Sequence, residues 1–246
     1  MFKKENFPVK LFIIASLLSF IILGMLFVLL NINFKYPRLV NNNLSEDKYY
    51  FKQNFNESDP LITKVPSLDN ILSGPILSNL DPGLGPEEAK VAVIIFSDFK
   101  CDYCLKQEQA LKTIISKYGE QIRLFWKDYP ETDRNSESFQ AAVAARCAFV
   151  QGKFWPYHDL LFASKQNYNK DFFIKLAKEI GLSLNNFTIC LDDAETYQQI
   201  ENNILEAQAL NINGVPFIYV NDQEIMGEIS LTELDKIIKA ELEKLP

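Results

Sequence analysis

The longest apolar run of the chain lies near its N-terminus. Leu11–Leu30 contains no charged residue, and about 20 residues at about 1.5 Å per residue are enough to cross the ~30 Å hydrocarbon core of a bilayer. The run is longer than the apolar region of a typical signal peptide, and no small-residue cleavage site follows it. The pattern therefore predicts an uncleaved signal anchor that spans the membrane once, with a cleaved signal peptide as the alternative.

Positive charges flank the predicted anchor on both sides. Three lysines precede it within residues 1–10, and Lys35 and Arg38 follow it. Because positive charge accumulates on the cytoplasmic side, this count favours a cytoplasmic N-terminus by a small margin. We therefore expect residues 1–10 in the cytoplasm and the bulk of the chain on the periplasmic or other extracytoplasmic side, where disulfides persist.

Residues 31–86 are polar and rich in turn-forming residues. This composition predicts a spacer between the membrane and a folded domain, with a short edge strand at Ile71–Leu80. The end of the segment, Asp81–Pro86, is dense in Pro and Gly and marks the entry to the domain. We therefore assign residues 87–246 to a single folded domain.

Two apolar runs at the start of this domain flank an amphipathic segment. Val91–Phe96 is almost wholly apolar, which is typical of a strand buried on both faces, and Ile122–Trp126 is a second such run. Between them, Leu105–Tyr118 has apolar residues at helical spacing and ends before Gly119. This order predicts two parallel strands joined by a right-handed helical crossover.

A long helical stretch separates this unit from the C-terminal strands. Successive helical patterns define an insert at about residues 132–210. Gly214–Val220 then predicts a strand entered through a proline, Gln223–Met226 a hairpin partner, and Leu231–Leu245 an amphipathic closing helix. The predicted fold class is α/β: a βαβ unit, a helical insert and a ββα unit.

Composition narrows the range of functions. The chain has 246 residues and a net charge of −7, which argues against a nucleic-acid partner because phosphate binding needs clustered Lys and Arg. Its four cysteines are Cys101, Cys104, Cys147 and Cys190. They are too few to form a disulfide scaffold in a chain of this length.

Cys101-Asp-Tyr-Cys104 lies between the first buried strand and the helix that follows it. Unpaired backbone N–H groups and the helix dipole at this helix start stabilise the Cys101 thiolate by up to ~2 kcal/mol, or roughly 1.5 pKa units. The position predicts thiol–disulfide exchange, with Cys101 as the attacking sulfur and Cys104 as the resolving one. The alternatives are half of a structural zinc site, which would need a second ligand pair, and two core cysteines.

Several segments of the chain, taken in order, resemble one family. Phe96–Cys104, Gln151–Trp155 with Tyr157–Phe162, and Gly214–Phe217 are similar to segments of DsbA-type thiol–disulfide oxidoreductases of the thioredoxin superfamily, over about Glu88–Leu245. The resemblance implies a thioredoxin fold with a helical insertion. It also implies that the protein introduces disulfide bonds into exported cysteine-containing client proteins, that a quinone-linked membrane partner re-oxidises it, and that it needs no cofactor or metal ion.

The resemblance also assigns roles to residues around the cysteines. Pro216 is expected in the cis form, facing the cysteine pair, with the backbone of Val215 free to pair with a client peptide. Phe99 and Tyr103 flank the cysteines and serve either as an apolar substrate surface or as packing around the turn. Asp102-Tyr103 replaces the Pro-His pair of the family's best-known member, so no imidazole stabilises the thiolate. The negative charge of Asp102 beside the Cys101 sulfur is expected to raise the pKa of that thiol, and we therefore expect a milder oxidant.

Cys147 and Cys190 both fall in the helical insert. In an oxidising compartment we expect them to form a structural disulfide, and the alternative is two separate buried thiols. A closed loop of ~43 residues could contribute roughly 4 kcal/mol of stability in the chain-entropy model.

Other polar residues invite functional interpretations that we do not favour. His158 is the chain's only histidine, and its position beside Trp155 and Tyr157 predicts a packed helix residue. Asp192-Asp193 is expected to cap the following helix. Glu206 is expected on a solvated helix face.

Two further functions remain open on this sequence. The first is a disulfide isomerase or reductase on the same fold, and the second is a redox-regulated chaperone or binding protein that uses the same face. An isomerase usually needs a dimerisation domain, which the polar spacer is not expected to supply. A copper-handling protein would carry Met or His near its cysteines, and neither flanks Cys101 or Cys104.

Overall fold

The computed structural model describes residues 73–164 and 168–244. The predicted anchor at Leu11–Leu30, the expected cytoplasmic N-terminus and the predicted spacer up to residue 72 lie outside the described residues. Within the two described ranges, no helix combines the length and the apolar character needed to cross a membrane.

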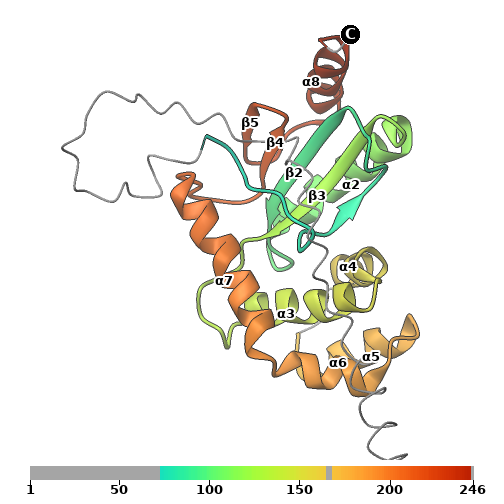
Figure 1. Cartoon of the computed structure of the whole chain (residues 1–246), viewed down its shortest axis with the longest axis vertical. Helices are drawn as coiled ribbons and strands as arrows, with labels where there is room; N and C mark the ends of the chain where they lie inside the picture. Colours follow the sequence, from blue (N-terminus) through green and yellow to red (C-terminus); the bar gives the residue numbers. More distant parts are fainter. Residues whose placement is uncertain (1–72, 165–167, 245–246) are drawn as a thin grey trace, which may run out of the picture. The chain divides into compact units, whose positions relative to one another are not determined.

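A five-stranded sheet forms the centre of the domain (Figure 1). Its strands, in the spatial order β1-β3-β2-β4-β5, are β1 (Gly83–Leu84), β2 (Val91–Ser97), β3 (Ile122–Asp128), β4 (Phe217–Val220) and β5 (Gln223–Met226). β2 and β3 run parallel, as predicted, whereas β4 is antiparallel to β2 and β5 to β4. Because Phe96 pairs with Phe217, the end of β2 lies beside the start of β4.

The helices follow the predicted order (Figure 1). Their bounds are α2 (Asp102–Tyr118), α3 (Glu137–Val150), α4 (Phe154–Ala163), α5 (Lys170–Glu179), α6 (Leu184–Leu191), α7 (Ala194–Ala209) and α8 (Leu231–Glu243). Helices α3 to α7 form the insert between β3 and β4. The expected cap before α7 is confirmed, because the Asp193 carboxylate accepts a hydrogen bond from the Thr196 backbone N–H.

β2 is buried on both faces because its side chains alternate between two apolar clusters. The odd-numbered residues from Val91 to Ile95 pack into the larger cluster, together with residues of α2 and α8. The even-numbered residues from Ala92 to Phe96 pack into a smaller cluster that includes Ala207 of α7. The continuous apolar run of the sequence is thus explained by helices on both sides of the strand.

Residues 76–84 pack against the sheet, although their composition places them in the spacer. β1 pairs with β3, and the Trp155 indole donates a 2.9 Å hydrogen bond to the Gly83 carbonyl. Over the described residues 73–80, the expected edge strand does not form. Ile76 and Leu80 remain exposed, and only Leu77 between them packs against the smaller apolar cluster. Polar contacts together with this one apolar contact, not an alternating apolar face, therefore hold the segment in place.

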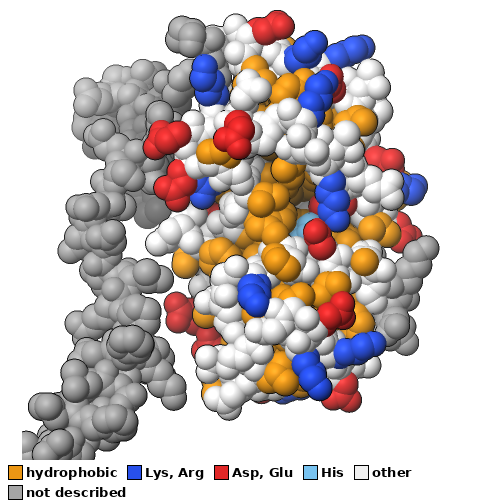
Figure 2. Space-filling view, turned by 90° about the vertical axis from the view of Figure 1, so that its right-hand side faces the viewer, with side chains coloured by type: hydrophobic (Ala, Val, Ile, Leu, Met, Phe, Trp, Pro, Cys, Tyr) orange, Lys and Arg blue, Asp and Glu red, His pale blue; other side chains and the backbone are white. Residues whose placement is uncertain are grey.

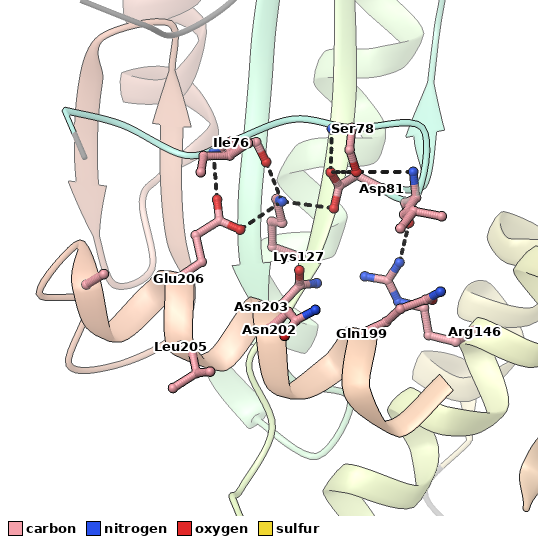
Figure 3. A pocket seen from close by; sticks show the side chains of 12 residues that line it. Ile76, Ser78, Asp81, Lys127, Arg146, Gln199, Asn202, Asn203, Leu205 and Glu206 are labelled. Carbon is pink, nitrogen blue, oxygen red and sulfur yellow. Dashed lines mark hydrogen bonds and ion pairs between the residues drawn. The ribbon is translucent and has the colours of Figure 1, made fainter. Parts of the chain in front are cut away.

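A buried group of charges provides those polar contacts (Figure 3). The Lys127 ammonium lies 2.9 Å from the Asp81 carboxylate and 3.0 Å from that of Glu206, and it donates a hydrogen bond to the Ile76 carbonyl. The expectation of a solvated Glu206 is therefore wrong, because α7 packs across β3 and brings the carboxylate against Lys127. Burial raises the pKa of Glu206.

Candidate active site

Cys101 is the N-cap residue of α2. β2 ends at Ser97, a short turn follows, and the Cys101 backbone is still extended at φ −81° and ψ 120°. Its sulfur accepts a 3.2 Å hydrogen bond from the Cys104 backbone N–H. The thiol therefore lies where the first free N–H groups of the helix point, which is the position that favours an anion.

The two thiols, both reduced in this structure, have opposite environments. A hydrogen bond from the Cys104 thiol lowers the pKa of Cys101 to about 7 against the effect of burial, and the backbone N–H groups of Cys104 and Tyr103 act in the same direction. Cys104 is 0% exposed, and burial raises its pKa well above the ordinary value, with the hydrogen bond to Cys101 adding to the effect. The thiolate of the reduced pair therefore resides on Cys101.

The loop before β4 faces this thiolate. The Val215–Pro216 peptide bond is cis, as the resemblance implies, and the Val215 carbonyl lies 3.6 Å from the Cys101 sulfur. A hydrogen bond from the Gly227 N–H to the Pro216 carbonyl, 2.8 Å long, fixes the loop to the β5 end. Segments more than a hundred residues apart in sequence thus meet at one sulfur atom.

Phe99 and Tyr103, for which the sequence left both a substrate surface and packing around the turn open, have different surroundings. Tyr103 is 60% exposed, with the Lys106 ammonium 5.1 Å from its ring centroid. Phe99 is 5% exposed and stacks on Trp126 with ring centroids 4.8 Å apart. Tyr103 is therefore available to a client, whereas Phe99 packs in the interior and only borders a hollow of about 290 Å³ beside Cys101.

Asp98 is a feature of the site that the sequence analysis missed. Burial raises the pKa of its carboxyl group, against hydrogen bonds from the Lys100 backbone N–H and the Ser138 side chain. Its negative charge in turn raises the pKa of Cys101. The sequence pointed to Asp102, which is exposed on the first turn of α2. No local pattern could reveal that Ser138 of α3 covers Asp98.

His158 is packed in the interior, as predicted, but it is not surrounded by apolar groups alone. Its ring lies against those of Phe99 and Trp126, with centroids 5.6 and 4.9 Å away. Its Nε2 lies 3.5 Å from a carboxylate oxygen of Glu108, which is one helical turn beyond Cys104 on α2. The spacing of i to i+4 places Glu108 on the same buried face of α2 as Cys104, but no local pattern signals its contact with His158.

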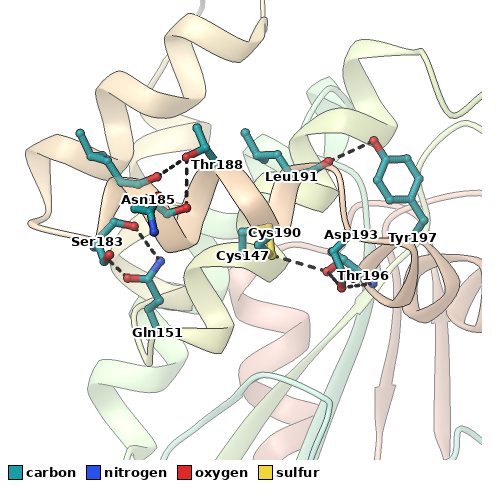
Figure 4. Close-up of a disulfide and its surroundings, with 11 residues drawn as sticks. Cys147, Gln151, Ser183, Asn185, Thr188, Cys190, Leu191, Asp193, Thr196 and Tyr197 are labelled. Atoms are coloured by element: carbon teal, nitrogen blue, oxygen red, sulfur yellow. Dashed lines mark hydrogen bonds between the residues drawn. A yellow bond between two sulfur atoms is a disulfide. The ribbon is translucent and has the colours of Figure 1, made fainter. Parts of the chain in front are cut away.

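Cys147 and Cys190 form a disulfide between α3 and α6, which is the expected pair (Figure 4). The Cys190 sulfur also lies 3.5 Å from the Thr196 hydroxyl. The bond closes a sequence separation of 43 residues within the insert. It joins two helices that carry neither cysteine of the Cys101–Cys104 pair.

Comparison with known proteins gives consistent matches. The sequence model of a family described as Thioredoxin matches residues 78–240. A thioredoxin-like oxidoreductase from Silicibacter pomeroyi is 25% identical, with a TM-score of 0.62 and coverage of 68% of this chain and 94% of that one. The thiol-disulfide exchange protein α-DsbA2 from Wolbachia pipientis is 24% identical, with a TM-score of 0.60 and coverage of 65% and 86%.

A curated protein that is named as an ion antiporter, and not as an oxidoreductase, also matches the chain. The Na(+)/H(+) antiporter NhaA 3 of Salinispora tropica is 30% identical over 164 residues, which make up 67% of this chain and 25% of that protein. The chain thus spans about a quarter of the length of the first curated relatives that it matches. Ion antiport is a property named for those proteins.

Proposed function

The chain belongs to the DsbA-like thioredoxin family, and on this basis we propose that it is a thiol–disulfide oxidoreductase that introduces disulfide bonds into exported proteins through Cys101 and Cys104. The observation that carries the proposal is the asymmetry of the two thiols. Cys101 is partly exposed with a pKa of about 7, and Cys104 is fully buried with a raised pKa. The Cys101 sulfur is therefore available to a client, and Cys104 is the thiol that re-forms the internal disulfide.

The reaction then runs as two exchanges. In the oxidised protein, a client thiolate attacks the Cys101 sulfur, the Cys101–Cys104 bond breaks, and Cys104 leaves with the electron pair. A second client thiolate attacks the client sulfur of the mixed disulfide and displaces Cys101 as a thiolate. The client has gained one disulfide, and the protein has gained two electrons. A pKa near 7 makes Cys101 a good leaving group in this second step.

Residues around the pair support binding of an extended client segment. Val215 has its carbonyl beside the Cys101 sulfur, so a client cysteine bonded to Cys101 would place its own backbone next to this loop. Tyr103, between the two cysteines in sequence, offers an exposed ring. We therefore propose backbone pairing at Val215, beside the cis Pro216, and apolar contact at Tyr103.

The proposed location is the extracytoplasmic face of the cell membrane, with the domain held by a single-pass anchor at Leu11–Leu30. The Cys147–Cys190 disulfide supports an oxidising compartment, because such bonds rarely persist in the cytosol. A quinone-linked membrane protein is the proposed re-oxidising partner. The exchange itself needs no cofactor, metal ion or nucleic acid.

One observation favours a second candidate, a reductase or isomerase on the same fold. The Cys101 pKa of about 7 is close to that of thioredoxin and well above that of DsbA, which is ~3.5. A less stable thiolate means a less stable dithiol form, and therefore a weaker oxidant. A chaperone or binding role on the same face is a third candidate, and no particular contact favours it.

The redox state of the pair in living cells separates these candidates. Rapid acid quenching, followed by alkylation with a maleimide that adds mass, shifts the gel mobility of the reduced protein. We expect Cys101–Cys104 to be largely oxidised at steady state, with a Cys101→Ala/Cys104→Ala variant as the mobility standard. A largely reduced pair would assign the protein to the reductases or isomerases.

A further inference from the structure

The buried Cys104 sulfur carries a negative charge for part of the proposed exchange, on which this inference rests. When a client thiolate attacks Cys101, the Cys101–Cys104 bond breaks and its electron pair stays on Cys104. Cys104 is 0% exposed and lies in the larger apolar cluster, and apolar side chains also gather along the middle of the face shown in Figure 2. A thiolate formed in such surroundings gains little from water. Its formation therefore depends on hydrogen-bond donors that already face the sulfur.

Ser97 is the last residue of β2 and the only polar one in that strand. Because side chains alternate between the two faces of a strand, Ser97 lies on the same face as Val91, Val93 and Ile95. Those three residues pack into the cluster that contains Cys104. Ser97 itself is 1% exposed. The pleat of β2 thus places a buried hydroxyl on the side of the sheet that α2 covers.

The Ser97 hydroxyl is held there without a hydrogen bond of its own. Among the residues that the structure describes, none forms a hydrogen bond of acceptable geometry with the hydroxyl oxygen. The backbone of Ser97 does have a partner, because its carbonyl accepts a 2.9 Å hydrogen bond from the Tyr129 N–H. A buried hydroxyl without a partner costs free energy of folding. Such a cost next to a reactive group is better explained by catalysis than by stability.

The end of β2 acts on the Cys104 sulfur. Burial raises the pKa of Cys104 well above its ordinary value, and the hydrogen bond to Cys101 adds to the effect, whereas the Ser97 side chain and the Asp98 backbone N–H both lower it. A donor lowers the pKa of a thiol by stabilising its thiolate. The neutral thiol of the reduced protein has no charge to stabilise. This explains why the hydroxyl faces Cys104 and yet forms no complete hydrogen bond in the dithiol form.

We propose that Ser97 is a catalytic residue, whose hydroxyl donates a hydrogen bond to the Cys104 sulfur while that sulfur is negatively charged, together with the Asp98 N–H. In the forward direction the client sulfur bonds to Cys101, the S–S bond breaks, and the Cys104 thiolate is stabilised until it takes a proton from water. In the reverse direction Cys104 loses its proton to water, its thiolate attacks Cys101, and the client leaves as a thiolate. Ser97 keeps its own proton throughout.

A hydrogen bond of this kind changes rates and not the equilibrium. Cys104 is uncharged in the disulfide, and burial keeps it a neutral thiol in the reduced protein. The Ser97 hydroxyl gains a charged partner only between these two states, so it lowers the barriers to opening and closing by the same amount. The reduction potential compares the end states alone and should therefore not depend on this hydroxyl.

Ser97→Ala tests this separation of rate and equilibrium. Opening is measured on the oxidised full chain in detergent: reduced glutathione is added, samples are quenched in acid, and the freed thiols are alkylated and counted by mass. Closing is measured as glutathione release from the mixed disulfide at Cys101. Both rates should fall roughly tenfold, because hydrogen bonds to charged groups are among the strongest in proteins. The equilibrium constant with glutathione should stay within about twofold.

Two controls isolate the effect. Ser116→Ala removes the hydroxyl of an exposed serine on α2 and should behave as the wild type. Alkylation of Cys101 by iodoacetamide places no charge on Cys104, so its rate should be the same in Ser97→Ala as in the wild type.

Three outcomes of the exchange assay are decisive. Unchanged opening and closing rates in Ser97→Ala would overturn the proposal and leave the proposed function intact. A slower opening with an unchanged closing rate would also overturn it, because the hydroxyl would then act on an end state. A wild-type disulfide that does not react with glutathione at all would instead refute the proposed function.

A second set of measurements separates catalysis from packing. Ser97→Ala should unfold at the same temperature as the wild type or a higher one, because the change removes a buried hydroxyl that has no partner. Ser97→Thr and Ser97→Val have nearly the same shape and differ in the hydroxyl, so the Thr variant should open and close roughly tenfold faster than the Val variant. A clear loss of stability in Ser97→Ala, or equal rates in the Thr and Val variants, would assign Ser97 a packing role and overturn the proposal.

Discussion

At the scale of single residues, the chemistry depends on how differently two cysteines three positions apart are placed. Cys101 precedes the first turn of α2 and is partly exposed, and Cys104 faces the core. The sequence predicts this difference, because a strand followed by a helix start fixes where the first thiol lies. It could not predict the partial burial of Asp98 or the proximity of Glu108 to His158. Both depend on the insert helices α3 and α4, which fold back against the βαβ unit.

The roles of the two cysteines lead to a trapping prediction. Cys104→Ala should accumulate covalent complexes with client proteins, since the mixed disulfide at Cys101 then lacks its buried resolving thiol. Cys101→Ala should trap few or none, because Cys104 is 0% exposed. Non-reducing electrophoresis of cells alkylated at harvest measures the covalent complexes of the two variants, with the double Ala variant as the blank. A ladder of complexes in Cys101→Ala alone would show that the roles are exchanged.

The pKa of Cys101 leads to a prediction of pH dependence. Alkylation of the reduced protein by iodoacetamide should speed up as pH rises, with a midpoint of about 7, because the thiolate is the nucleophile. Asp98→Asn should lower this midpoint by roughly 0.5 units, or ~0.7 kcal/mol, since a negative charge that opposes the thiolate is removed.

Asp98→Asn should also raise the reduction potential of the protein by ~15 mV and so make it a stronger oxidant, because the change stabilises the dithiol form. Equilibration with glutathione measures the potential. Asp102→Asn is the comparison, since Asp102 is exposed to solvent. If Asp102→Asn moves the midpoint and Asp98→Asn does not, Asp102, the acid identified from the sequence, controls the thiolate, and the partly buried Asp98 does not.

At the scale of secondary-structure elements, the apolar periodicity accounts for most of the domain. β2, β3 and α2 form where the pattern predicts them, because the spacing of their own apolar residues determines which side chains are buried. β1 does not, since a strand of two residues has no periodicity and lies in a Pro- and Gly-rich segment. The expectation that Glu206 lies on a solvated helix face was likewise wrong, because its partner Lys127 lies on a strand 79 residues earlier in the sequence.

The Cys147–Cys190 disulfide supports the insert and is separate from the reacting pair. Replacing both cysteines by Ala should lower the free energy of unfolding by about 2–4 kcal/mol, since the unfolded chain regains the freedom of the closed loop. Thermal and urea unfolding measure the loss. The rate of glutathione mixed-disulfide formation at Cys101 should stay within about twofold, and a large change there would mean that the insert transmits strain to the active site.

At the scale of the whole molecule, the active site is assembled from three distant parts of one domain. The cysteines come from the βαβ unit, the Val215–Pro216 loop from the C-terminal strands, and Ser138, which hydrogen-bonds to Asp98, from the insert. The order of the motifs predicts this plan through the family resemblance. Periodicity alone could not predict how the site is assembled, because it describes each element separately and not the strand register that places Phe217 beside Phe96.

The proposed placement at the membrane follows from combining this domain with the apolar run at Leu11–Leu30. If the run is an uncleaved anchor, the full-length protein should stay in the membrane fraction after carbonate washing. With a cytoplasmic N-terminus, protease added to intact spheroplasts should digest the domain, and a cytoplasmic marker protein should survive as the control. Carbonate-soluble protein shortened at its N-terminus would indicate a cleaved signal peptide. Complete protection from protease would place the domain in the cytoplasm, where both the proposed clients and the Cys147–Cys190 disulfide would be hard to explain.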